Sequence, residues 1–249
     1  MSKLLSAILL TIPMLFLSSC VIVPYDSDGI TLADIAYGFS NPYPNTVYLM
    51  EDGVYVPYLV FDSSYYNSGV LLLREELTDE TAMFKDTNVF NSEGNYYPKS
   101  DVNQYLNGEF FAKFSEPLRN AIEVSSIEVT SLSAISAEFY NRNTETFQCK
   151  VFLLSATEIG VQNSMAAIEG RQIRGLDKFP ASGSQWLRTA YLWDDVHAWA
   201  CGEGSTGQEA LRTKLHLRPA FTLSPSLIVT EKEGIISGES VFVLEIDKT

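Results

Sequence analysis

The chain is poor in the residues on which most enzymes and nucleic-acid-binding proteins depend. Its 249 residues include two histidines, three cysteines, and 17 basic residues against 31 acidic ones. A net charge of −14 and the lack of any basic run argue against nucleic acid as a partner, and against adhesion to anionic lipid through charge. Two cysteines beyond the amino-terminal segment are also too few for a zinc site.

Motifs of catalysis are equally scarce. No Gly-x-Ser-x-Gly elbow is present, and His197 and Cys201 are four positions apart, which on one strand separates them by about 13 Å. A nucleophile needs a base within hydrogen-bonding distance, so this pair does not supply one. The glycine-rich stretch 202–207 lacks the lysine of a phosphate-binding loop and carries Glu203. No two of the acidic residues stand out as a glycosidase pair.

The amino terminus has the pattern of a bacterial lipoprotein signal. Lys3 precedes an apolar stretch, 4–17, that is too short to span a bilayer comfortably, and the stretch ends in Leu-Ser-Ser-Cys at Cys20. We expect residues 1–19 to be a signal peptide and Cys20 to carry the lipid that anchors the protein to a membrane. A plain signal peptide with a chance cysteine, or an ordinary anchor helix, is the alternative. The expected location is the cell envelope, and Val21 favours the outer membrane if the source has two membranes.

The remainder divides into a tether and one domain. Residues 20–44 are interrupted by proline, glycine and aspartate, so we expect a flexible tether. Residues 45–249 are long enough to bury one core. Asp52-Gly53 between two apolar stretches predicts a hairpin. Ser100 and Ser115 each stand where a helix is expected to begin.

Strand patterns dominate this domain. Strands are expected at 47–49, 54–61, 69–74, 123–132, 146–154 and in the carboxyl-terminal third, with a last hairpin around Glu233-Gly234. Ser155 and Glu158 form a capping box that predicts one short helix, and residues 160–184 predict a long loop. The long amphipathic helices of βαβ units are missing. The fold class is therefore α+β, a mostly antiparallel sheet with short helices and long loops.

Three strands are expected within residues 185–223, which carry all three tryptophans and both histidines. If the apolar alternation faces the core, the opposite face gathers six aromatic and basic side chains. Flat rings beside guanidinium groups are suited to ligand stacking. The alternative is that a loop covers this face and the arginines form structural ion pairs. The six residues are Trp186, Arg188, His197, Trp199, His216 and Arg218.

The two cysteines of the domain, Cys149 and Cys201, leave two alternatives open. Export permits a disulfide between them. However, Cys149 alternates with apolar residues, whereas Cys201 lies on the opposite kind of face. Two free thiols are therefore an equally good expectation.

Several segments, in order, resemble the bacterial family named DUF6273, a domain of unknown function. They are YLVFD at 58–62, GVLLL at 69–73, SDVNQYLNGEFF at 100–111, VFLLS at 151–155 with Glu158, WLR at 186–188 and RPAF at 218–221. The order and spacing cover about residues 47–225. The chain departs from the common pattern at Thr189, Ala190 and Leu217. The family supplies no catalytic residues to carry over.

The WLR and RPA segments are also similar to those of C-type-lectin-like and sulfatase-modifying-factor-like domains. This likeness implies a C-type-lectin-like fold with a long loop region on one side. Lectin-like domains often hold calcium with loop acids, and Trp193-Asp194-Asp195 is similar in type, so Asp194 and Asp195 are candidate calcium ligands. The alternative is that both acids are solvated at the start of a strand. No other cofactor is expected.

We therefore predict a lipid-anchored envelope protein that is a non-enzymatic binding module for a glycan or an envelope protein. An envelope hydrolase or modifying enzyme is one alternative, and an architectural component of the envelope is the other.

Overall fold

The computed structural model describes residues 29–37, 44–65, 69–87, 93–135, 141–202, 205–236 and 238–246, with only the backbone of residues 62–64. The expected signal peptide, Cys20, Val21 and much of the expected tether lie outside these residues. None of the helices within the described ranges has the length and apolar character needed to cross a membrane.

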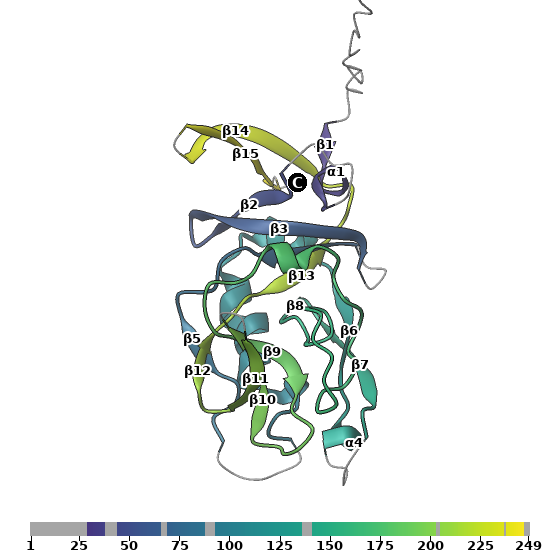
Figure 1. Ribbon diagram of the computed structural model, residues 1–249. Helices are drawn as coiled ribbons and strands as arrows, with labels where there is room; N and C mark the ends of the chain where they lie inside the picture. Colours follow the sequence, from purple (N-terminus) through teal and green to yellow (C-terminus); the bar gives the residue numbers. More distant parts are fainter. Residues whose placement is uncertain are drawn as a thin grey trace, which may run out of the picture.

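The fold is α+β and mostly antiparallel, as the strand patterns predicted. An eight-stranded sheet has the order β1-β14-β15-β2-β3-β4-β13-β8, and a five-stranded sheet has the order β11-β10-β9-β12-β5. A further pair joins β6 to β7. In Figure 1 the strands β2, β3, β14 and β15 lie above, with β9 to β12 and the β6–β7 pair beneath them on opposite sides. Two neighbouring pairs, β15 with β2 and β12 with β9, are parallel.

The eight-stranded sheet contains strands from both ends of the chain, and two smaller sheets complete the fold. Its strands are β1 (Ile30–Thr31), β2 (Thr46–Glu51), β3 (Val54–Tyr65), β4 (Gly69–Arg74), β8 (Val151–Phe152), β13 (Ala220–Leu223), β14 (Ile228–Ile236) and β15 (Glu239–Val243). The five-stranded sheet consists of β5 (Thr81–Met83), β9 (Gln185–Ala190), β10 (His197–Gly202), β11 (Ser205–Ala210) and β12 (Lys214–His216). The pair is β6 (Ser125–Thr130) and β7 (Thr144–Cys149).

The predicted hairpin joins β2 to β3. Asp52 and Gly53 both have positive φ, 47° and 83°, and Glu51 pairs with Val54 across the turn. Two successive residues with positive φ match the twist of a tight hairpin, and Asp-Gly adopts them at low cost. The strand pattern and the turn together therefore determined this register locally.

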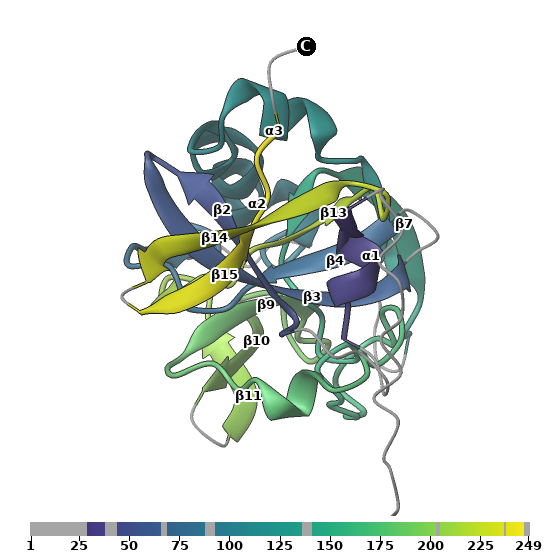
Figure 2. The ribbon, with the colours of Figure 1, turned by 90° about the horizontal axis from the view of Figure 1, so that it is seen from above.

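Short helices follow the predicted caps. Ser100 Oγ accepts a hydrogen bond from the Asn103 N–H at 3.0 Å and starts α2 (Asp101–Tyr105), which continues as a π-helical turn (Leu106–Phe110). Ser115 Oγ caps α3 (Glu116–Ala121) in the same way. The remaining helical turns are α1 (Leu32–Ile35), α4 (Leu132–Ile135) and two 3-10 turns, Tyr97–Lys99 and Leu176–Lys178. Figure 2 shows α2 and α3 on one side of β2 and β3, opposite β10 and β11.

The folded part begins earlier than the expected tether allows. Residues 30–35 form β1 and α1, β1 pairs with β14, and Leu32 and Ile35 are completely buried in the core. The expectation of a tether up to residue 44 is corrected here. Proline, glycine and aspartate favour an irregular segment, but two apolar side chains spaced three apart in one helical turn are enough to anchor it.

Three local expectations were also wrong in detail. The predicted strand 146–154 divides at Lys150 into β7 and β8, which belong to different sheets, because Asn107 accepts hydrogen bonds from the Lys150 and Val151 N–H groups at 3.1 Å. The final hairpin turns near Gly238, and Glu233 lies at a bulge instead. Ser155 and Glu158 form both capping-box bonds, but the segment continues as turns and not as a helix.

Candidate functional site

The expected aromatic and basic face does not form, because the strand register separates its members. Trp186 pairs with Ala200, and Gln185 pairs with Cys201, across β9 and β10. Directly paired residues project to the same side of a sheet, so Trp186 lies on the side of Ala200. Trp199 lies on the side of Cys201. The prediction of one shared ligand face is therefore wrong.

Both tryptophans of these strands are buried. The Trp186 ring meets Phe84 edge to face at 5.5 Å, and its Nε1–H donates to the Ala82 carbonyl oxygen. Trp199 packs on Leu187 and the segment that follows β8, and its Nε1–H donates to the Met165 carbonyl oxygen. The expectation that these two indoles form an accessible surface for ligand stacking is therefore wrong.

Arg188 is completely buried in a network of two carboxylates. It holds Glu158 through two hydrogen bonds, from Nη1 at 2.6 Å and Nη2 at 2.8 Å, and its Nε lies 3.9 Å from Glu169. Tyr65 also donates to Glu158. Glu169 accepts from the Thr130 N–H and hydroxyl and from the Thr189 hydroxyl. The network attaches the start of the long loop to β3, β6 and β9. Arg188 therefore forms a structural ion pair, which was the alternative to a ligand-binding role.

The two histidines lie in separate places, and one of them contacts the candidate calcium ligand Asp194. His197 Nδ1 lies 2.8 Å from both carboxylate oxygens of Asp194, and His216 Nδ1 lies 2.7 Å from the Thr78 carbonyl oxygen. The buried Asn95 amide donates to the carbonyls of Tyr191, Asp194 and His197 and holds the 191–197 turn in place. Within the described ranges no three His, Cys, Asp or Glu side chains come together as a metal site.

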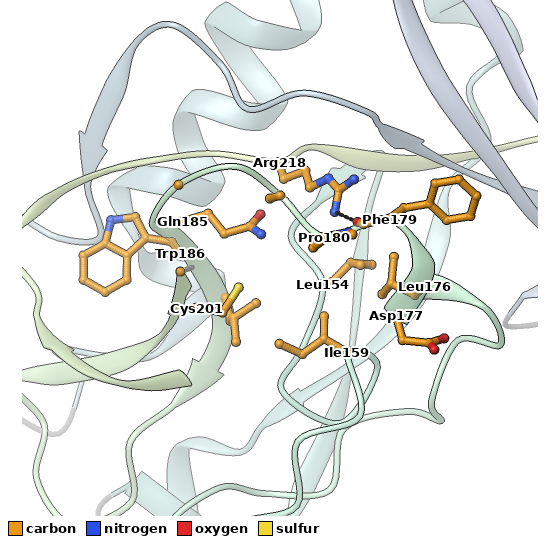
Figure 3. Close-up of a pocket in the computed structure, with 14 residues that line it drawn as sticks. Leu154, Ile159, Leu176, Asp177, Phe179, Pro180, Gln185, Trp186, Cys201 and Arg218 are labelled. Carbon is orange, nitrogen blue, oxygen red and sulfur yellow. Dashed lines mark hydrogen bonds between the residues drawn. The ribbon is translucent and has the colours of Figure 1, made fainter. Parts of the chain in front are cut away.

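A pocket of about 410 Å³ lies between the long loop and the strands β9 and β10 (Figure 3). This volume is within the usual range for small-ligand sites, about 300–1,000 Å³. Asp177 and Arg218 are the charged residues among its lining, and Cys201 and Gln185 are further polar ones. Most of the other lining residues are apolar: Leu154, Ile159, Leu176, Phe179, Pro180, Ala181, Trp186 and Leu187.

Arg218 supplies the positive charge of this pocket. Its Nε, Nη1 and Nη2 donate to the carbonyl oxygens of Arg74, Phe179 and Glu75 at 2.9, 2.9 and 3.0 Å. The residue is 6 % exposed, and among the described residues no carboxylate lies within 4 Å of it. Burial lowers the pKa of Arg218 to about 10, so the side chain remains charged at neutral pH.

Gln185 and Cys201 lie beside this charge. The register pairs these two residues directly across β9 and β10. Burial raises the pKa of Cys201, while Gln185 and Arg218 partly oppose this effect, so the thiol stays protonated at neutral pH. Figure 3 shows Gln185 between Cys201 and Arg218, whereas the Trp186 ring points away from the hollow. Both cysteines are free, so the expected alternative of a disulfide is wrong.

The sequence pattern indicated Arg218 as a candidate ligand-binding residue, and this residue lines the pocket, but the pattern indicated neither Gln185 nor the apolar wall. Arg218 stood out because it alternates with apolar residues. Gln185 had no such signal, since an uncharged polar residue at the start of a strand is ordinary. Its position became meaningful only when β10 placed Cys201 opposite it.

The unfolding free energy should depend on pH through Glu169. Burial raises the pKa of this carboxyl above its ordinary value of 4.5. A folded-state pKa above the unfolded value means that the stabilisation from the bound proton is complete below about pH 4.5 and is lost as the pH rises through the folded pKa. Glutamine does not titrate, so we expect the free energy of unfolding of the wild type minus that of Glu169→Gln to decrease as the pH rises. Urea denaturation from pH 4 to 8 measures both values. If the wild-type value minus the variant value increases with pH, the raised pKa of Glu169 in the folded protein is contradicted.

Comparisons with known proteins agree with the family resemblance. The family model described as a domain of unknown function, DUF6273, matches residues 67–225, more than half of the chain. No curated protein and no solved structure matches the chain.

Proposed function

Because this chain belongs to the DUF6273 family, whose function is unknown, we propose a function from the geometry of its pocket. The protein is a lipid-anchored component of the cell envelope, and its domain is a non-enzymatic binding module. The observation that carries this proposal is the pocket beneath the long loop. At one end of its apolar wall lies the buried, charged Arg218, whose hydrogen bonds to other described residues all go to carbonyl oxygens.

The lining of the pocket favours a segment of protein over a glycan as the ligand. An accessible aromatic platform was the reason to expect a glycan, and Trp186 and Trp199 are both buried. Apolar walls with a few polar groups are suited to a peptide side chain and its neighbouring backbone. A C-type-lectin-like arrangement, with the ligand bound at the long loop on one side of the sheet, is part of the proposal and rests on sequence resemblance.

The chemistry of the pocket supports binding more than catalysis. Cys201 is the one thiol in its lining, and the raised pKa of that thiol disfavours the nucleophilic thiolate. None of the described lining residues is a histidine that would take up its proton. His197 and His216 make their hydrogen bonds to Asp194 and Thr78 instead.

An array of peptides and cell-wall glycan fragments tests this function. The full chain, purified in detergent, is applied with and without a calcium chelator. We expect peptide binding that survives chelation and is lost in Ala181→Phe, which fills the pocket from its lining. The matched control is Ala112→Phe, at an exposed alanine beyond the pocket. Binding that is equal in both variants, or binding of glycans alone, would overturn the proposed function. Loss on chelation would return Asp194 and Asp195 to consideration.

The anchor is tested separately by metabolic labelling. We expect labelled palmitate to enter the wild-type chain and the Cys149→Ala control, and to be absent from Cys20→Ala. Palmitate in Cys20→Ala would overturn the anchor and would leave the function of the pocket untouched.

A further inference from the structure

The pocket has a positive end and an apolar end. Arg218 and Gln185 are both more than nine-tenths buried, and both line the hollow. Leu154, Ile159 and Leu176 line it farther along. Figure 3 shows the Gln185 amide on the side of Arg218, with the three aliphatic side chains below and beside them. A ligand that matches this lining has an anionic group next to an aliphatic one.

Within the described part of the chain, the guanidinium does not use all of its hydrogen-bond donors. It carries five N–H groups, and its bonds to three carbonyl oxygens use one each from Nε, Nη1 and Nη2. These bonds fix the plane of the group, so a ligand meets a donor pair that is already oriented. Charge-assisted bonds from an arginine to a planar carboxylate are shorter and stronger than bonds between neutral groups.

The acidic residues near Arg218 do not form a close ion pair with it within the described part of the chain. Glu75 influences Arg218 through space, but its carboxylate is not among the ion-pair partners within 4 Å in the described part of the chain. Asp177 lines the pocket, and in Figure 3 its carboxylate points away from Arg218. A buried charge without a close counter-charge is costly in a low-dielectric environment, and a ligand carboxylate reduces this cost.

We propose that the pocket binds a carboxylate that is attached to an aliphatic group, with the carboxylate between Arg218 and Gln185 and the aliphatic group against Leu154, Ile159 and Leu176. This inference rests on the proposed function and deepens it. The same chemistry has two sources, the carboxyl terminus of a peptide that ends in an aliphatic residue and a free aliphatic carboxylic acid.

Arg218 also has a structural role, since it ties three carbonyl oxygens together. A purely structural role predicts no preference for an acidic ligand over its neutral counterpart. The test therefore compares ligands on the wild-type protein first, so that it does not depend on a variant that fails to fold.

The experiment titrates the full chain in detergent with acetyl-Ala-Ala-Leu, with its carboxyl-terminal amide, and with 4-methylpentanoate, by calorimetry. We expect the peptide acid to bind at least about tenfold more tightly than the amide, because the amide loses the charge-assisted bonds. Arg218→Gln should reduce binding of the acid to the level of the amide. Binding of 4-methylpentanoate as tight as that of the peptide acid identifies a free acid as the source, and weaker binding identifies a peptide terminus.

The outcomes separate the inference from the proposed function. Equal binding of acid and amide, with both lost in Ala181→Phe, overturns the carboxylate and supports the pocket as a peptide site. Acid binding that persists in Ala181→Phe overturns both. If none of the three ligands binds, the inference is overturned, and the peptide array then decides the proposed function.

Discussion

Replacing Arg188 with methionine should lower the free energy of unfolding by about 3–5 kcal/mol, the usual cost of removing one partner from a buried ion pair. The guanidinium holds Glu158 through two hydrogen bonds and lies beside Glu169, and the side chains of all three residues are completely buried. Methionine fills much of the volume but removes the positive charge that Arg188 places beside both carboxylates. Urea denaturation at neutral pH measures the loss.

A matched control is available on the surface. Arg212 pairs with Asp86 at 2.9 Å, and about half of each side chain is exposed. Arg212→Met should cost less than about 1 kcal/mol, because water screens such pairs. Equal losses in the two variants would mean that burial of the Arg188 network contributes nothing special to stability.

The deficit of Arg188→Met should also decrease in acid. Burial raises the pKa of Glu169, and protonation of this carboxyl removes part of the uncompensated charge, so the difference from wild type should narrow as the pH falls from about 7 to about 4. A deficit that is independent of pH would point to lost packing against Phe152, whose ring lies 5.9 Å from the guanidinium carbon, as the cause.

Replacing Phe221 with alanine should also cost about 3–5 kcal/mol, the range for removing a large aromatic side chain from a core. The Phe221 ring lies 5.3 Å from the rings of both Tyr58 and Phe114, measured between centroids, and the side chain is completely buried. β13 carries this residue between β4 and β8, next to one edge of the eight-stranded sheet, and its side chain belongs to the main hydrophobic core, so the substitution opens a cavity in that core.

Two further variants separate the cavity from the chemistry of the ring. Phe221→Leu retains most of the volume and should cost less than about 1.5 kcal/mol. Phe111→Ala removes a ring that is only partly buried, under Lys150, and should cost clearly less than Phe221→Ala. A loss in Phe111→Ala that equals the loss in Phe221→Ala would contradict the assignment of Phe221 to the centre of the core.

Local features were predictable where a few neighbouring residues decide the outcome. The turn at Asp52-Gly53 depends on the φ values that aspartate and glycine tolerate. The caps at Ser100 and Ser115 depend on a hydroxyl three residues before a free N–H. In each case the interacting atoms lie within four positions of one another. Alternation along single strands is equally local, so the α+β class and most of the strands could be predicted from the sequence alone.

The candidate site depended on contacts between distant segments. Alternation sorts the residues of β9 and β10 into two sets, but it does not say which set of one strand meets which set of the other. A shift by one residue reverses the faces, and the observed register placed Gln185 beside Cys201 and removed Trp186 from that side. Glu158 was predicted as a helix cap. It is also the buried partner of Arg188, a contact between distant segments that the local pattern does not indicate.

The division between sequence and structure therefore follows distance along the chain. Propensity, capping and turn chemistry act over a few residues, so their results could be predicted from the sequence. Contacts between distant segments produced the burial of the arginines, the division of strand 146–154 at Lys150 and the pocket around Arg218. They depend on pairings that join residues dozens of positions apart, and many registers satisfy the same local pattern until the core selects one.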